Sequence, residues 1–187
     1  PTTTDASSST NEDTAVDITL SSTEIDSGDT ITYSIVSDVS NGSTSLSGST
    51  VTYTPDTNYN GTDTFTYKAN DGTGDSNTST ITITVAAVND APLASAVSSS
   101  TNEDTDKAIT LSATDIEGSS LTYSIVSNPS NGSLGSISGV GVTYTPDENY
   151  NGTDTFTYKA NDGTADSNTA TVTVTVAAVN DAPVAQN

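Results

Sequence analysis

The chain has 187 residues and a formal net charge of −21, because 24 Asp and Glu residues stand against three Lys and no Arg. It contains no His and no Cys, which excludes a Ser-His-Asp triad, a thiol nucleophile, a disulfide and the usual zinc sites. Three Lys residues cannot form the basic face that nucleic acid requires, and no apolar run approaches the roughly 20 residues that span a bilayer.

Runs of alternating apolar and polar residues follow one another along the first half of the chain. Successive residues of a strand face opposite sides, so each run predicts a strand with one apolar face and one Ser/Thr-rich face. The β-branched residues that fill these runs suit a pleated surface, and no stretch has the spacing of an amphipathic helix. The apolar members of the runs are Val16, Ile18 and Leu20; Ile31, Tyr33 and Ile35; Val51 and Tyr53; Phe65, Tyr67 and Ala69; and Ile81, Ile83 and Val85.

Turn signals separate these predicted strands. They are Ser27-Gly28-Asp29, Asn41-Gly42, Asn60-Gly61 and Asn70-Asp71-Gly72, in which Asn and Gly are expected to supply positive φ. Short strands and turns at this spacing, within about 90 residues, predict a Greek-key β-sandwich of the immunoglobulin type.

The second half of the chain repeats the first. The phrase AAVNDAP occurs twice, with Asn89 and Asn180 lying 91 residues apart, and residues 51–80 match residues 142–171 at 27 of 30 positions. Leu, Ile, Val and Phe together number 33 of 187, below the roughly 20% at which a highly charged chain is usually disordered, but the ordered repeat favours folded units. We predict an all-β chain of two tandem domains, residues 1–91 and 92–183, with residues 184–187 opening a further repeat.

The acidic residues gather in four short stretches of each predicted domain. Carboxylate and amide oxygens crowded into loops are typical ligands of calcium, which takes six to eight oxygens. Taken alone, Asn-Asp-Gly is an ordinary hairpin turn and Asn-Asp-Ala-Pro an ordinary linker. Their occurrence together at matching positions favours calcium. The stretches are Asn11-Glu12-Asp13, Glu24-Ile25-Asp26, Asn70-Asp71-Gly72 and Asn89-Asp90, then Asn102-Glu103-Asp104, Asp115-Ile116-Glu117, Asn161-Asp162-Gly163 and Asn180-Asp181.

Several of these motifs resemble those of a known family. VNDAP resembles the inter-domain linker of cadherins, ATDIEG their Asp-x-Asp loop, and KANDG their Ala-x-Asp motif. With YTPDxNYNGTDTFTYKANDG, the pattern is similar to the bacterial cadherin-like and immunoglobulin-like tandem repeats of large surface proteins such as RTX adhesins. The resemblance covers both units. It implies cadherin-like sandwiches in an end-to-end rod at the bacterial cell surface, in which calcium at each junction stiffens an extender that projects a distal adhesive domain.

The resemblance also implies a ligand set. The usual pair of aspartates is absent, because the first unit has Glu24 and Asp26 where the second has Asp115 and Glu117, so the number of calcium ions per junction stays open. At the junction within this chain the expected Ca²⁺ ligands are Glu12, Asp63, Asn89, Asp90, Asp115, Glu117 and Asp162. Their equivalents at outer junctions are Glu24, Asp26, Asp71, Glu103, Asp154, Asn180 and Asp181.

We therefore predict a non-enzymatic, monomeric spacer whose partners are neighbouring repeats of the same chain. Paired carboxylates can hydrolyse a glycoside, but these acids lie in turns and the chain has no Trp to line a sugar cleft. The alternative is an adhesion module that recognises a carbohydrate or a protein through its sandwich loops, and a third possibility is a homophilic contact. A binding unit should carry one divergent loop. The variable stretch, residues 43–50 against 133–141, is small and polar, which favours the spacer.

Overall fold

The computed structural model describes residues 1–25 and 28–180, and the chain divides into two compact units, Pro1–Val88 and the residues from Asn89 onward. Each unit is an all-β sandwich, and the described residues contain no helix. Among them there is consequently no helix long and apolar enough to cross a membrane. Three parts of the prediction, Asp26, Asp181 and the further repeat at residues 184–187, lie outside the described residues.

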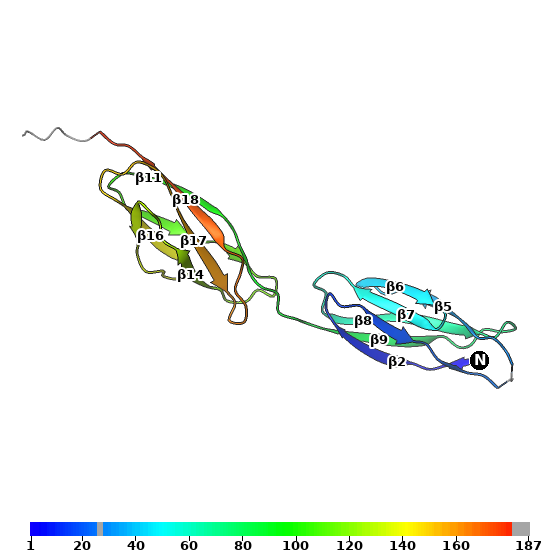
Figure 1. The fold of residues 1–187 in the computed structure, drawn as a ribbon. Helices are drawn as coiled ribbons and strands as arrows, with labels where there is room; N and C mark the ends of the chain where they lie inside the picture. The colour runs from blue at the N-terminus through cyan, green and yellow to red at the C-terminus, as the bar shows by residue number, and fades with distance from the viewer. Residues whose placement is uncertain (26–27, 181–187) are drawn as a thin grey trace, which may run out of the picture. The chain divides into compact units, whose positions relative to one another are not determined.

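The first unit is built from nine strands within its described residues. They are β1 (Thr2–Thr3), β2 (Ala6–Asn11), β3 (Val16–Thr19), β4 (Ser22–Thr23), β5 (Thr32–Ser37), β6 (Gly42–Ser47), β7 (Thr50–Pro55), β8 (Gly61–Asn70) and β9 (Ser79–Ala86). A four-stranded sheet has the order β2-β9-β8-β5, in which β2 runs parallel to β9, and a three-stranded sheet has the order β3-β7-β6 (Figure 1). The short strands β1 and β4 form a separate antiparallel pair.

The second unit repeats this plan strand for strand. Its strands are β10 (Leu93–Ala94), β11 (Val97–Asn102), β12 (Lys107–Thr110), β13 (Ala113–Thr114), β14 (Thr122–Ser127), β15 (Gly132–Leu134), β16 (Gly141–Pro146), β17 (Gly152–Asn161) and β18 (Ala170–Ala177). The sheets are β11-β18-β17-β14 and β12-β16-β15, with β10 paired to β13. The predicted fold, two tandem immunoglobulin- and cadherin-like sandwiches, is confirmed.

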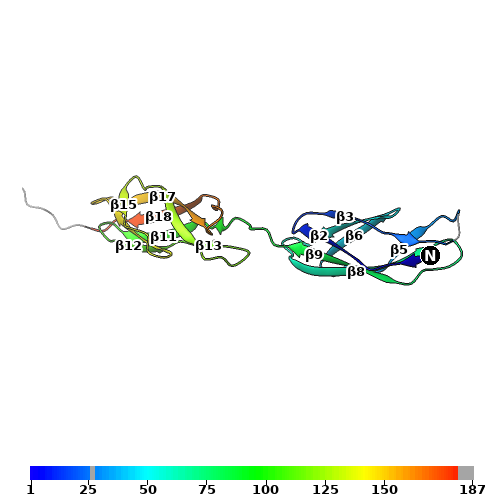
Figure 2. The same ribbon diagram turned by 90° about the horizontal axis from the view of Figure 1, so that it is seen from below.

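The two sheets of each unit lie face to face (Figure 2), and predicted apolar residues form the core between them. In the first unit Ile18, Val51 and Tyr53 of the smaller sheet join the buried residues of β8 and β9 in one core. The second unit has the equivalent core around Tyr144 and Phe156. On β8 these buried residues alternate with Thr residues that are exposed or partly buried, as the period of two predicts.

One predicted turn uses its glycine for a different reason. Gly28, Gly61 and Gly72 have positive φ as expected, with values of 112°, 139° and 95°. Gly42 does not; instead, a Cβ atom there would lie 2.4 Å from the carbonyl oxygen of Thr54 and 2.8 Å from the ring of Tyr53. The expectation of a left-handed residue at Asn41-Gly42 is therefore wrong. The glycine is needed because the buried tyrosine packs directly against the backbone of β6.

Candidate metal-binding site

The residues that open the second unit are tied to two of its acidic loops. The side-chain amide of Asn89 donates a hydrogen bond to Asp162 Oδ2 at 2.8 Å, and the backbone N–H of Asp90 donates to Glu117 Oε1 at 3.2 Å. Four residues of the predicted ligand set thus meet at one edge of this unit. We call this edge, made by Asn89, Asp90, Glu117 and Asp162 together with Asp115 from the loop of Glu117, the acidic edge of the second unit.

The Asp162 loop is held in place by its own hydrogen bonds. Asp162 Oδ1 accepts the N–H groups of Thr164 and Ala165, each at 2.6 Å. The pKa of Asp162 lies below its ordinary value, because the hydrogen bonds from Ala165, Asn89 and Thr164 favour the charged carboxylate. The side chains of Lys159 and Asp166 form an ion pair at the base of this loop. Asp162 therefore offers an ionised, preoriented carboxylate.

Asp115 carries an oxygen that the fold leaves without a donor. Its Oδ1 atom accepts the backbone N–H of Ser119 at 2.7 Å. Its Oδ2 atom is buried and has no hydrogen-bond partner among the described residues. A buried acceptor without a partner is costly, so this oxygen is available to a cation.

The first unit brings a cationic group to the equivalent position. Glu24 and Asp71 correspond to Asp115 and Asp162 at the 91-residue offset. The N-terminal ammonium of Pro1 lies 2.9 Å from Glu24 Oε2 and 3.8 Å from Asp71 Oδ2. Asp71 has a lowered pKa, chiefly because Gly74 and Thr73 donate backbone hydrogen bonds to it. Glu24 and Asp71 thus approach one atom from two loops of the first unit.

The chemistry of the acidic edge fits a hard cation, although its carboxylates are not drawn into one centre. No group of three or more carboxylates close enough to hold a metal is present in residues 1–25 and 28–180. Amide N–H groups of Asn89 and Asp90 instead occupy oxygens of Asp162 and Glu117. Calcium prefers carboxylate, amide and carbonyl oxygens as ligand atoms, and these are the oxygens found at the acidic edge. A bound ion would have to displace these hydrogen bonds.

Glu12 and Glu103 lie where each unit ends. Glu12 is only 4% exposed, and its Oε1 atom accepts the N–H of Val88, the residue before Asn89. Glu103, 6% exposed, accepts the N–H of Val179 in the same way, next to Asn180. Each glutamate therefore holds in place the residue that directly precedes the Asn-Asp pair at the end of its unit.

Asp63 and Asp154 have a different environment from the other predicted ligands. Asp63 is 4% exposed and accepts four hydrogen bonds within its unit, from Ser40 N, Asn41 N, Thr64 N and the hydroxyl of Tyr53. Asp154 accepts the equivalent four. Burial alone raises the pKa of Asp63, but these bonds outweigh it and lower the pKa below its ordinary value. Both carboxylates are occupied by the fold, and we leave them out of the proposed ligands.

Two asparagines that sequence reasoning missed hold the start of each unit. Asn168 Oδ1 accepts the N–H of Ala94 and its Nδ2 donates to the carbonyl of the same residue, at 2.9 and 3.0 Å. Asn77 does the same for Thr3. These side chains copy the pairing of a neighbouring strand. Their only sequence signal is their place in the repeated Asp-Ser-Asn-Thr string.

Comparison with known proteins agrees with this fold. A family model described as "Bacterial Ig domain" matches residues 1–84 and 89–175. No curated protein matches the chain. The structure is similar to human protocadherin-24 EC1-2, with a TM-score of 0.53, 13% identity and coverage of 94% of both chains. It is also similar to human mucin-like protocadherin EC1-2, with a TM-score of 0.52, 19% identity and coverage of 95% of this chain and 97% of the other.

A weaker likeness involves a much longer protein. The chain, at 95% coverage of its own length, spans only 28% of an endo-fucoidan hydrolase from glycoside hydrolase family 107, with 21% identity and a TM-score of 0.41. At that score the likeness carries no argument about function. The protocadherin similarities, at their low identity, bear on the fold alone.

Proposed function

Because the chain belongs to the bacterial Ig domain family, whose members are typically non-catalytic modules, we propose that its two sandwiches are calcium-stiffened spacer repeats of a larger adhesin. The adhesin is secreted or held at the bacterial cell surface, and the spacer projects a distal adhesive domain. In this proposal the segment works as a monomer, and its partners are neighbouring repeats of the same chain.

The observation that carries the proposal is a buried carboxylate oxygen in the second unit. Asp115 Oδ2 has no hydrogen-bond partner among the described residues, and Asp162 of the same acidic edge offers a preoriented carboxylate. A carboxylate oxygen without a donor, with further carboxylate and amide oxygens on the same edge, suits a divalent oxygen-seeking ion. The proposed ligands are Asn89, Asp90, Asp115, Glu117 and Asp162.

Such an ion would act on the linker. Val88 is held to the first unit by Glu12, and Asn89 and Asp90 donate hydrogen bonds to Asp162 and Glu117 of the second unit. Replacing those weak, exposed bonds with calcium coordination would immobilise the linker on the second unit. The freedom left to the linker would then be confined to the few torsions around Val88 and Asn89, which is what a stiff spacer requires.

The test is thermal unfolding of the whole chain in chelator, in chelator with about 0.5 M sodium chloride, where the Debye length is about 4 Å, and in excess calcium. A ligand that binds only the folded state stabilises it by about 2.7 kcal/mol at a hundredfold excess over Kd. Each kcal/mol moves the midpoint of a domain of this size by roughly 4 to 8 °C. One site should therefore raise Tm by more than about 10 °C, whereas salt, which only screens repulsion, should raise it far less.

The variant Asp115→Asn should lose most of the calcium-dependent rise. Asp106→Asn is the matched control, because Asp106 is exposed and its Oδ1 atom accepts only the hydroxyl of Thr145. Small-angle scattering of the same samples measures stiffness through the maximum dimension. If chelator changes neither Tm nor the maximum dimension, the acids are a solvated surface and the calcium role is wrong.

A further inference from the structure

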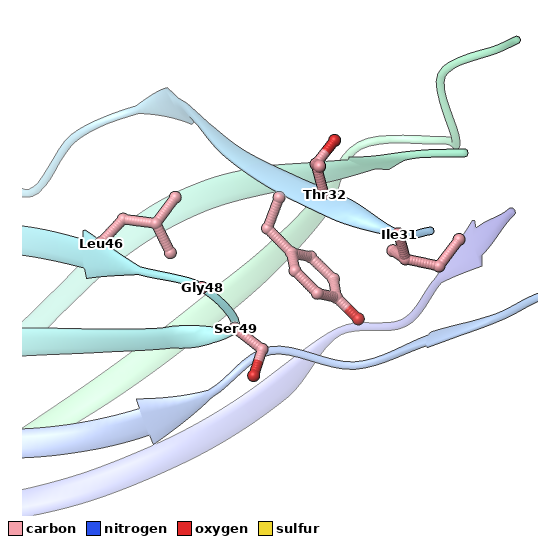
Figure 3. A pocket seen from close by; sticks show the side chains of 6 residues that line it. Ile31, Thr32, Leu46, Gly48 and Ser49 are labelled. Carbon is pink, nitrogen blue, oxygen red and sulfur yellow. The ribbon is translucent and has the colours of Figure 1, made fainter. Parts of the chain in front are cut away.

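The first unit has an open pocket that is lined by no acidic residue. It is formed where the start of β5 faces the turn between β6 and β7 (Figure 3). Leu46 and Ser49 lie on the hairpin side of this space and Ile31 on the β5 side. The residues that line it are Ile31, Thr32, Tyr33, Leu46, Gly48 and Ser49.

The lining combines an apolar floor with hydroxyl groups and has no charge. Ile31, Tyr33 and Leu46 are all partly buried. The Tyr33 hydroxyl is hydrogen-bonded to Ser22 Oγ at 3.2 Å, so the tyrosine ring is held in place. The Ser49 hydroxyl has no hydrogen bond within the described part of the chain, and the residue is exposed. Small-ligand sites have this composition: mostly apolar walls with a few polar groups that fix orientation.

The charge of the chain narrows the class of ligand. At a net charge of −21 the surrounding field repels anions. The lining offers no carboxylate that would select a cation. A purely aliphatic guest would leave the hydroxyl of Ser49 without a new partner, whereas Thr32 Oγ1 already donates to the carbonyl of Asn70. A pyranose ring matches both parts, because it has a C–H face for the aromatic and aliphatic floor and a belt of hydroxyls for the rim.

We propose that this pocket binds one ring of a neutral carbohydrate. The C–H face of the ring lies on Tyr33 and Leu46, and its hydroxyls exchange hydrogen bonds with Ser49. The site is independent of calcium and adds a weak binding function to a spacer repeat.

The second unit supplies a control within the same molecule. Leu121, Thr122 and Tyr123 repeat the β5 side of the pocket. On the hairpin side, Val140 replaces Ser49 and is 47% exposed. Ile137 stands for Leu46, and each packs against the core of its own unit. The free hydroxyl of the rim is therefore missing from the second unit, and the divergent stretch of the repeat is the one that forms the pocket.

The test is a titration of the whole isotope-labelled chain with methyl β-glucopyranoside, methyl α-mannopyranoside and methyl β-galactopyranoside, followed by amide NMR shifts at a fixed calcium concentration. At least one glycoside should shift the amides of residues 31–33 and 46–49 with a Kd on the order of 1 to 10 mM. The amides of residues 121–123 and 137–140 should stay in place. Ser49→Val, which copies the second unit, should weaken glycoside binding to the first unit at least fivefold. Val140→Ser, in the second unit, should leave binding to the first unit unchanged.

Glucuronate and isobutanol distinguish the other ligand classes. Equal binding of glucuronate, or shifts with isobutanol but with none of the glycosides, would overturn the assignment to a neutral sugar. Absence of shifts at residues 31–33 and 46–49 with all three glycosides would overturn the site itself. Unchanged core resonances will show that the Ser49→Val variant still folds. If this folded variant binds as tightly as the parent, the proposed role of the rim is wrong.

Discussion

In the first unit β6 pairs with β7 over six residues, from Gly42 opposite Pro55 to Ser47 opposite Thr50. In the second unit β15 pairs with β16 over only three, from Gly132 opposite Pro146 to Leu134 opposite Tyr144. The chain then bulges out and returns through a separate bridge between Ser138 and Gly141. The cause is one additional residue in the second stretch, which breaks the register of the hairpin.

The long strands of the larger sheets, in contrast, do not differ between the two units. β8 and β17 have the same sequence, and each carries the same buried aspartate, the same tyrosine contact and the same lysine–aspartate pair. Residues that the fold depends on are repeated, whereas the hairpin at the edge tolerates a change of length. The edge hairpin is therefore the part of a repeat whose sequence can change without disturbing the core.

The acidic ends of the two units differ for another reason. Their loops are alike, but Asn89 and Asp90 reach the loops of the second unit, while the Pro1 ammonium reaches those of the first. The loops themselves are the common part, and the proposed calcium role rests on them.

The largest expected effect falls on the repeated core. Asp63→Ala removes the acceptor of three partly buried hydrogen bonds from backbone N–H groups, and Asp154→Ala does the same in the second unit. Each unsatisfied group costs about 1 to 3 kcal/mol, so each variant should lose about 3 to 5 kcal/mol in its own unit. Denaturant unfolding followed by amide NMR, which reports the two units separately, measures both losses.

Asp17→Ala is the control, because Asp17 is exposed and its Oδ1 atom accepts only the hydroxyl of Thr52. Its effect should stay within about 0.5 kcal/mol. If Asp63→Ala and Asp154→Ala differ by more than about 1 kcal/mol, the equivalence of the two cores is broken.

Asp63 also shows which features of the structure could be predicted from the sequence and which could not. The period of two predicted the strands correctly, because burial on one face imposes that pattern on local sequence. Asp63 shares its parity with Phe65 and Tyr67, so its inward direction was visible in the sequence. Its donors were not, because Ser40 and Asn41 come from a loop more than 20 residues away. The parallel pairing of β2 with β9 was likewise beyond a local pattern.

The same carboxylates give a smaller effect of pH. The pKa of Asp63 and of Asp154 is lowered in the folded chain. Near the ordinary Asp pKa of about 3.9, the unfolded chain therefore binds more protons than the folded chain. The stability they contribute is present above that value and is lost as pH falls through the lower folded pKa. Unfolding at a series of pH values below about 5 should show this loss, and Asp63→Asn should flatten it in the first unit alone.

At high pH the tyrosine partner acts in the opposite direction. Burial, with the charge of Asp63, raises the pKa of Tyr53 to about 12. The unfolded tyrosine ionises near its ordinary pKa of about 10, so stability should fall as pH rises from about 10 towards 12. Tyr53→Phe should weaken this alkaline dependence. Tyr59→Phe, which loses a bond to the carbonyl of Thr62 and only a minor contribution to the raised pKa of Tyr53, should keep most of it. An unchanged alkaline curve for Tyr53→Phe would contradict the assignment.

The smallest effect concerns the acidic ends, and it tests whether the preceding residues decide what the loops hold. Placing a copy of residues 88–91 before Pro1 replaces the ammonium with a peptide bond and supplies an Asn and an Asp, as in the second unit. The loop around Glu24 and Asp71 should then bind calcium with an affinity at least tenfold higher, about 1.4 kcal/mol. Calorimetric titration should report one more binding event per chain than the parent shows in the same concentration range.

A second extension, in which Ser replaces the added Asn and Asp, separates the two contributions. It removes the ammonium but brings no new ligands, so its gain should be intermediate. Glu24→Gln in the full extension should cancel the gain, because it neutralises the carboxylate that lies 2.9 Å from the ammonium in the parent chain. If parent and extended chains bind calcium with the same number and affinity of sites, the loops do not hold the ion. The likeness between the ends of the two units would then be one of shape only.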